Sequence, residues 1–214
     1  MKRLLVLRPE PGNRATVQRA KAMGLEPLPF PLFSVEAVEW TAPDPLGFDV
    51  ILFTSANALR HGGDQLAGLT ALGALAVGPA TADAARGAGF RVVMTGEEGV
   101  EKLLEGLPGA QRLLHLAGAD HYAPIRQGIE TVVVYRSVSL EAPVIPPGRF
   151  VALVHSPRAG GRFAALIPNR ARFSIAAISR SAAAACGRGW AALDVADQPN
   201  DRALLALAAW LCQD

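Results

Sequence analysis

Short apolar runs alternate along the chain with stretches whose apolar residues recur at helical spacing. The clearest example is residues 74–93, where Gly78-Pro79 breaks one apolar run and a second run follows Gly89. The Ala-rich stretch between them begins near Thr81 and has the pattern of a helix, while apolar runs bounded by Gly and Pro are typical of buried strands. The segment is therefore expected to form a strand, a turn, a helix and a strand.

The same order of patterns returns at residues 174–195, with Ser179-Arg180-Ser181 where the first copy has Gly78-Pro79-Ala80-Thr81. Three more pairs of segments match in the same way: 48–57 with 150–159, 92–107 with 193–212, and 3–23 with 112–138. In the last pair a helix is expected near residues 122–127. The chain thus contains two sets of strand–loop–helix units.

Two further segments have strand patterns of other kinds. Residues 25–31 are too rich in proline for a central strand and are expected at an edge or in a connector. Residues 32–38 alternate and could pair as an exposed strand. Repeated strand–helix units predict an α/β fold of parallel sheets with helices on both faces, because each parallel crossover must pass over a face.

The loops that follow the predicted strands hold the candidate binding residues. Ligands of such sheets gather at the carboxyl ends of the strands. The residues at these ends are Arg8, Thr54, Ser55, Gly78, Gly118, Ser156 and Ser179. Two sets of loops predict two similar lobes that face a cleft, and the repeats leave open whether the lobes are contiguous halves or interleaved.

Composition and charge fit a folded protein that binds a small anion. The chain has 214 residues, 50% of them hydrophobic and 19% charged, with a net charge of +2. This mild basic excess fits an anionic ligand better than a nucleic acid, which requires denser basic patches. Lysine occurs only at positions 2, 21 and 102. The prevalence of arginine suits carboxylate binding, but a GC-rich genome would produce it too.

Several other classes are excluded or disfavoured. Cys186 and Cys212 lie far apart, so neither a disulfide framework nor a zinc site is indicated. No dinucleotide or phosphate-loop motif follows a strand, so no cofactor is expected. The first apolar run is too short for a secretory signal, and no run is long enough to span a membrane, so we expect a cytoplasmic protein. The four histidines show no ligand spacing, and no acidic residue near His155-Ser156 indicates a catalytic triad.

Several segments together resemble one known family. They are residues 53–59, 76–82 with Gly89-Phe90, 131–136 and 196–201, with Arg8-Pro9 after the first strand and His155-Ser156-Pro157 after another. Their order and spacing are similar to those of the uroporphyrinogen-III synthase family over nearly the whole chain. The resemblance implies an enzyme of two flavodoxin-like lobes with parallel sheets, joined by a two-stranded antiparallel ladder, with a cleft between the lobes. The first lobe would be residues 1–33 and 141–214, the second 38–131, and the ladder 34–37 and 132–140.

The resemblance also implies a reaction. This family, a group of hydro-lyases, closes the linear tetrapyrrole hydroxymethylbilane into uroporphyrinogen III with loss of water and inversion of ring D. The protein would mainly fold a flexible octacarboxylate so that the correct carbons meet. Backbone N–H groups at helix N-termini can hold carboxylates, and small residues let them approach. The implied binding residues are Thr54, Ser55, Ala56, Asn57, Gly78, Thr81 and Gly118 on one lobe, and Arg8, Ser156, Arg158, Ser179 and Ser181 on the other. Each hydroxyl could instead be a plain helix cap.

Tyr135 is the side chain expected to take part in proton chemistry. A tyrosine stays protonated at neutral pH and can donate to a departing hydroxyl, and the corresponding tyrosine is the favoured acid of the family. The alternative is a strand tyrosine that packs at the junction of the lobes.

Two other functions remain as alternatives to the cyclase. One is a non-catalytic two-lobed sensor that closes on a small anion. The other, a flavodoxin-like receiver or flavoprotein, is disfavoured because Arg8-Pro9 follows the first strand, without an acidic cluster or a phosphate loop. No long apolar external stripe stands out, so a monomer is expected.

Overall fold

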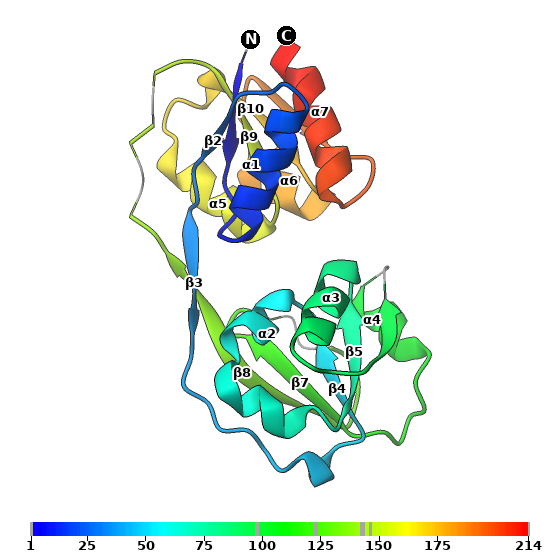
Figure 1. Ribbon diagram of the computed structural model, residues 1–214. Helices are drawn as coiled ribbons and strands as arrows, with labels where there is room; N and C mark the ends of the chain where they lie inside the picture. The colour runs from blue at the N-terminus through cyan, green and yellow to red at the C-terminus, as the bar shows by residue number, and fades with distance from the viewer. Residues whose placement is uncertain (1, 97–98, 122–123, 142–143, 146, 214) are drawn as a thin grey trace. The chain divides into compact units, whose positions relative to one another are not determined.

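A computed structural model describes residues 2–96, 99–121, 124–141, 144–145 and 147–213 (Figure 1). The chain divides into two compact units. Unit 1 comprises Met1–Ser34 and Ser139–Asp214, and unit 2 comprises Val35–Val138. The chain therefore leaves unit 1, builds the whole of unit 2 and returns.

Unit 1 is a five-stranded parallel sheet in the order β11-β10-β9-β1-β2. Its strands are β1 (Arg3–Val6), β2 (Pro27–Pro29), β9 (Phe150–Val154), β10 (Phe173–Ala177) and β11 (Ala192–Val195). The central strands β1, β9 and β10 are almost entirely buried, which is why they are continuous apolar runs. The proline-rich β2 lies at the edge, where missing N–H donors are tolerated.

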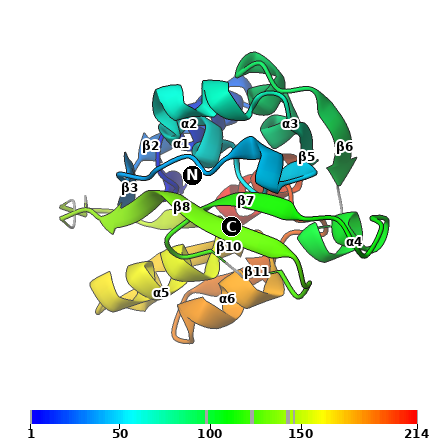
Figure 2. The ribbon, with the colours of Figure 1, turned by 90° about the horizontal axis from the view of Figure 1, so that it is seen from below.

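Helices cover both faces of this sheet. The helices α1 (Gly12–Ala22) and α7 (Asp201–Gln213) pack with Leu4 and Val6 on one face. The helices α5 (Pro157–Leu166) and α6 (Arg180–Cys186) pack with Leu5 on the other and lie side by side (Figure 2). Alternate residues of β1 thus enter opposite cores, as expected for a strand buried on both faces.

Unit 2 is a six-stranded mixed sheet in the order β3-β8-β7-β4-β5-β6. Its strands are β3 (Phe33–Ala37), β4 (Val50–Phe53), β5 (Gly73–Val77), β6 (Val92–Gly96), β7 (Leu113–Gly118) and β8 (Ile129–Ser139). The strands from β4 to β8 pair in parallel. The backbone amide of Val38 donates to the carbonyl of Val134, and the backbone amide of Leu140 donates to the carbonyl of Leu32. β3 therefore runs antiparallel to β8.

The helices of unit 2 again lie on both faces of its sheet. The helix α2 (Ala56–His61) packs with Ile51 and Phe53, and so does α3 (Pro79–Gly87), whereas α4 (Val100–Glu105) packs with Leu52 on the other face. Three 3₁₀ turns complete the chain: η1 (Pro45–Gly47) and η2 (Gly63–Leu69) in unit 2, and η3 (Arg170–Arg172) in unit 1.

In each sheet the chain adds strands first on one side of its starting strand and then on the other. The strand order locates this switch point. In unit 1 the chain moves from β1 to β2 on one side and to β9, β10 and β11 on the other. In unit 2 it moves from β4 to β5 and β6 on one side and to β7 and β8 on the other. Ligands of open α/β sheets bind at such switch points, outside the carboxyl ends of the strands. The expected sites therefore lie beyond β1 and β9 in unit 1, and beyond β4 and β7 in unit 2.

The mixed α/β fold expected from the sequence is confirmed, but one expected helix is wrong. Of residues 122–127, Tyr122 and Ala123 lie outside the described residues, and Pro124–Gln127 form a bend and a turn. The side chain of Arg126 donates to the carbonyls of Leu104, Leu107 and Pro108. This segment is held by that guanidinium rather than by helical hydrogen bonds. No helix within the described ranges has the length and apolar character that crossing a membrane requires.

Candidate functional site

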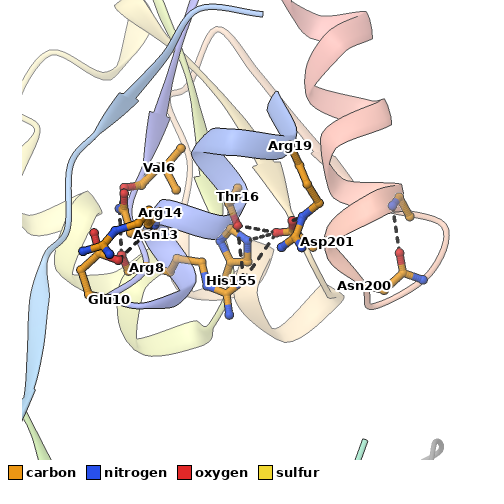
Figure 3. A network of polar contacts seen from close by, with 11 residues as sticks. Val6, Arg8, Glu10, Asn13, Arg14, Thr16, Arg19, His155, Asn200 and Asp201 are labelled. Carbon is orange, nitrogen blue, oxygen red and sulfur yellow. Dashed lines mark hydrogen bonds and ion pairs between the residues drawn. The ribbon is translucent and has the colours of Figure 1, made fainter. Parts of the chain in front are cut away.

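The switch point of unit 1 carries a network of charged and polar side chains (Figure 3). Arg8 lies just after β1, His155 follows β9, and Asp201 is the first residue of α7. Thr16 and Arg19 come from α1. We call these five residues the Asp201 network.

Asp201 is the centre of this network. Its Oδ1 accepts hydrogen bonds from His155 Nε2 and Thr16 Oγ1, both at 2.8 Å. Its Oδ2 accepts from Arg19 Nε at 2.8 Å, and a terminal guanidinium nitrogen of Arg8 lies 3.5 Å from Oδ1. One carboxylate thus connects the loops after two central strands with two helices.

These contacts determine which groups carry charge. Burial by itself would raise the pKa of Asp201, but hydrogen bonds from His155 and Thr16, with the charge of Arg19, hold that pKa well below its usual range. Burial lowers the pKa of His155 more than its hydrogen bond to Asp201 raises it. At neutral pH Asp201 is ionised and His155 is neutral, with its proton on Nε2 because a carboxylate can only accept. Two guanidinium groups against one carboxylate leave the network with a net positive charge.

The loop that carries Arg8 is fixed by its backbone as well. The amide of the buried Asn13 donates to the carbonyl of Val6 at 2.7 Å and to that of Arg8 at 3.0 Å. The Arg8 guanidinium lies against Gly12, where a Cβ atom would come within 2.4 Å of Arg8 Nε. Gly12 therefore makes room for the side chain of Arg8.

The network includes one contact that the sequence did not indicate. No acidic residue lies near His155 along the sequence, and the carboxylate that reaches it, that of Asp201, lies 46 positions further along the chain. Only the return of the chain through β10, α6 and β11 brings the two together. The neighbouring Ser156 hydroxyl accepts from the amide of Ala159 and caps α5, so its described contacts do not make it a nucleophile of a triad.

The switch point of unit 2 holds uncharged polar groups. Thr54, directly after β4, lies with its Oγ1 3.0 Å from Nε2 of His115 on β7, and Thr131 Oγ1 lies 3.4 Å from the other ring nitrogen. His115 is fully buried, and burial, with a smaller effect of His121, lowers its pKa to about 4. It is a neutral core histidine with a hydroxyl within reach of each nitrogen.

Tyr135 lies at the same edge of the sheet, on β8 and paired with Gly118 of β7. Its ring lies against Gly118, whose carbonyl also accepts from Nδ1 of His121 at 2.9 Å. The ring centroid of His61, at the end of α2, is 6.3 Å from that of Tyr135. Burial, with the charge of Arg60, lowers the pKa of His61. The tyrosine expected to donate a proton thus has the His61 imidazole near its ring, and the residue it packs against, Gly118, binds a second imidazole, that of His121; no motif indicated this grouping.

Three of the expected serines are helix caps. Ser55, Ser156 and Ser179 each accept a hydrogen bond at 3.2 Å from an amide in the first turn of α2, α5 and α6. The hydroxyl oxygens of Ser179 and Ser181 lie 3.0 Å apart. Each capping serine oxygen thus accepts one hydrogen bond from its own helix and can accept another. The helix N-termini that these serines cap lie at the carboxyl ends of the strands.

The remaining expected residues occupy the same loops. Gly78 precedes α3 with φ +83°, a left-handed conformation that favours glycine. Thr81 and Ala56 are buried in the first turns of α3 and α2, and Asn57 accepts from Arg60 at 3.1 Å. Arg158 of α5 places its guanidinium 4.7 Å from the ring centre of Phe33. Within the part of the chain that the structure describes, no group of three or more His, Cys, Asp or Glu side chains could hold a metal ion.

Comparison with known proteins gives one consistent result. The sequence profile of the family described as uroporphyrinogen-III synthase HemD matches residues 14–206. The uroporphyrinogen-III synthetase of Helicobacter pylori 26695 has a similar structure, with a TM-score of 0.71 and 19% identity over 99% of this chain and 100% of that one. A mutant uroporphyrinogen III synthase of the extremely thermophilic bacterium Thermus thermophilus is similar over the full length of both chains, with a TM-score of 0.55 and 17% identity. Curated protein sequences give no significant match.

Proposed function

Because the chain belongs to the uroporphyrinogen-III synthase family, we propose that it cyclises hydroxymethylbilane to uroporphyrinogen III, with loss of water and inversion of ring D. The observation that carries this proposal is the family match over residues 14–206. The similar fold of two solved synthases agrees with it. The alternative of a non-catalytic anion sensor is not favoured by that match.

The reaction requires positioning more than chemical activation. The hydroxyl of the substrate leaves as water after gaining a proton, and an electrophilic azafulvenium cation remains. Attack by the substituted carbon of ring D gives a spiro intermediate, which fragments and closes again through the other carbon of that ring with loss of a proton. Without enzyme the same substrate closes uninverted, so the protein must hold the flexible chain with the disfavoured carbon near.

Carboxylate binding falls to the loops at the two switch points. In unit 1 the Asp201 network has a net positive charge, and Arg8, Ser156, Arg158, Ser179 and Ser181 lie in or directly after loops at the carboxyl ends of β1, β9 and β10. In unit 2, equivalent places at or after the carboxyl ends of β4, β5 and β7 are held by Thr54, Ser55, Ala56, Asn57, Gly78, Thr81 and Gly118. Backbone amides at helix N-termini favour anions through their orientation and dipole, which supports the assignment.

Tyr135 is the proposed general acid for departure of the hydroxyl. Its position beside Gly118, at the carboxyl edge of the strands next to the switch point, supports this role. Tyr135→Phe removes the phenol and keeps the ring. Since one general acid contributes about 10²–10⁴-fold, the variant should keep measurable activity.

The test is to supply hydroxymethylbilane and separate the type I and type III isomers of the product. The enzyme should convert the substrate to type III faster than a blank forms type I, and Tyr135→Phe should form type III more slowly. A protein that leaves only type I would be a binder and not a cyclase. We propose that the enzyme acts as a monomer in the cytoplasm, which light scattering of the purified protein and cell fractionation would test.

A further inference from the structure

The side chain of Arg8 is held at several points within the Asp201 network. Its guanidinium lies 3.5 Å from Asp201 Oδ1 and 3.4 Å from Thr16 Oγ1. It also occupies the space above Gly12 that any larger residue would fill. Arg8 has further contacts beyond these. A long, flexible side chain is thereby kept in one place at the switch point of unit 1 (Figure 3).

The exposure of the two partners differs in a way that matters for an incoming anion. The side chain of Arg8 is 33% exposed, whereas that of Asp201 is 16% exposed. Asp201 uses its oxygens within the network, and His155, which fills one of these contacts, is neutral. An anion that approaches therefore meets the guanidinium rather than the carboxylate.

We propose that Asp201 is the positioning residue of a carboxylate subsite in unit 1, where it holds the Arg8 guanidinium for one carboxylate group of the substrate. The inference rests on the proposed function for the identity of that substrate. Asp201 itself does not touch the ligand. A guanidinium already ordered loses less side-chain entropy on binding, and its planar fork fits a carboxylate with two parallel hydrogen bonds.

Removal of the negative charge of Asp201 distinguishes positioning of Arg8 from a purely electrostatic effect on the bound anion. If Asp201 only offset positive charge, Asp201→Asn would leave the network more positive and lower the KM for a polyanion. If Asp201 positions Arg8, the same change weakens the binding of the substrate. The two accounts predict shifts of KM in opposite directions.

A second variant disturbs Arg8 without changing a polar group. Gly12→Ala places a methyl group within 2.4–2.7 Å of the positions of the guanidinium atoms, so the flexible side chain must move aside. Gly12 begins α1, and alanine is a better helix former than glycine, so this variant should fold. The matched control is Gly87→Ala at the end of α3, where an added methyl group has no neighbour within 4 Å.

The experiment measures kcat and KM for hydroxymethylbilane in these variants, in Arg8→Gln and in Arg19→Gln. We expect Asp201→Asn and Gly12→Ala to raise KM about tenfold, the effect of losing one hydrogen bond to a charged group, with a smaller change in kcat. Arg19→Gln should raise KM less, and Gly87→Ala should match the wild type. In the Arg8→Gln background, Asp201→Asn should have no further effect on KM, because Asp201 acts through Arg8.

Several results would overturn the proposal. They are an unchanged or lower KM in Asp201→Asn, a wild-type KM in Gly12→Ala, an effect of Arg19→Gln as large as that of Asp201→Asn, or additive effects in the double variant. Should Asp201→Asn fail to fold, Gly12→Ala still tests whether displacing Arg8 weakens substrate binding, and a wild-type KM there rejects the proposal. If the wild-type protein forms no type III isomer, the proposed function fails, and the Kd for the stable octacarboxylate uroporphyrin decides the subsite: a Kd raised in Gly12→Ala supports it, and an unchanged Kd rejects it.

Discussion

A single methyl group added at Gly118 tests whether the position of the Tyr135 phenol matters. Gly118 is the last residue of β7, and its backbone lies outside the left-handed region, so alanine fits the main chain. The new Cβ atom would lie 2.5 Å from Cε2, 2.6 Å from Cζ and 2.9 Å from the hydroxyl oxygen of Tyr135. The ring of Tyr135 must therefore move, while no polar group is removed.

The size of the effect follows from these distances. Carbon atoms in contact prefer a separation of about 3.5–4.0 Å, so the ring must retreat by about 1 Å. A misplacement of about 1 Å at a reacting group can cost about 10²-fold in rate. Overpacking typically costs about 1–3 kcal/mol of unfolding free energy, and we expect the lower end because the ring is only partly buried. Gly118→Ala should thus lower kcat about 100-fold and leave the protein folded.

The assay is the rate of type III formation, measured beside Tyr135→Phe and the control Gly106→Ala, together with urea unfolding of each variant. Gly106 follows α4 with φ −79°, and its added methyl group would meet nothing closer than 4.0 Å. A folded Gly118→Ala variant with a kcat within twofold of wild type would refute the reasoning. A rate below that of Tyr135→Phe would show that Gly118 acts through something other than the tyrosine.

Two further predictions concern stability. The pKa of His115 is about 4 in the folded protein, below its value in the unfolded chain, so its contribution to the free energy of unfolding is complete above pH 6.5. As the pH falls toward 4, this contribution is lost, by about 3 kcal/mol in all. Urea unfolding at stepped pH should show the free energy of unfolding falling over this range, and an equal fall in His115→Asn would contradict the prediction. Ser156→Ala removes the cap of α5 and should cost about 1 kcal/mol of unfolding free energy; an unchanged thermal midpoint would mean that the hydroxyl does not stabilise the helix.

The patterns along the chain were enough to predict the type of most elements. Strands such as β9 are uninterrupted apolar runs because both of their faces are buried, and that burial is visible in the sequence. The order of strands within each sheet is a different matter, because hydrophobic period does not record which neighbour a strand pairs with. The segments matched as repeats nevertheless hold the same places in both sheets: the order β11-β10-β9-β1-β2 of unit 1 corresponds to β6-β5-β4-β7-β8 of unit 2, where β3 is added at the edge next to β8.

The candidate site, like the fold, was predictable in part. Residues at the carboxyl ends of strands could be named, because parallel strands place these ends at one edge. Pairs that form across the fold could not, since nothing local links His155 to Asp201 or His61 to Tyr135. The expected helix near residues 122–127 failed for the same reason: Arg126 bonds carbonyls about 20 positions earlier, a contact that no local pattern encodes.

The two switch points differ in charge, and this difference predicts how salt affects the reaction. In unit 1 the groups are ionised, with Arg8, Arg19 and Asp201 in one network, while in unit 2 the buried His115 is neutral and its partners are hydroxyls. Added salt screens the partly exposed Arg8 but has little effect on hydrogen bonds between neutral groups. Raising NaCl from about 0.05 M to about 0.5 M, over which the Debye length shrinks about threefold, should therefore raise KM while kcat stays nearly constant. An equal fall in kcat at saturating substrate would show that charge acts on the chemical step as well, and would reject this division between the units.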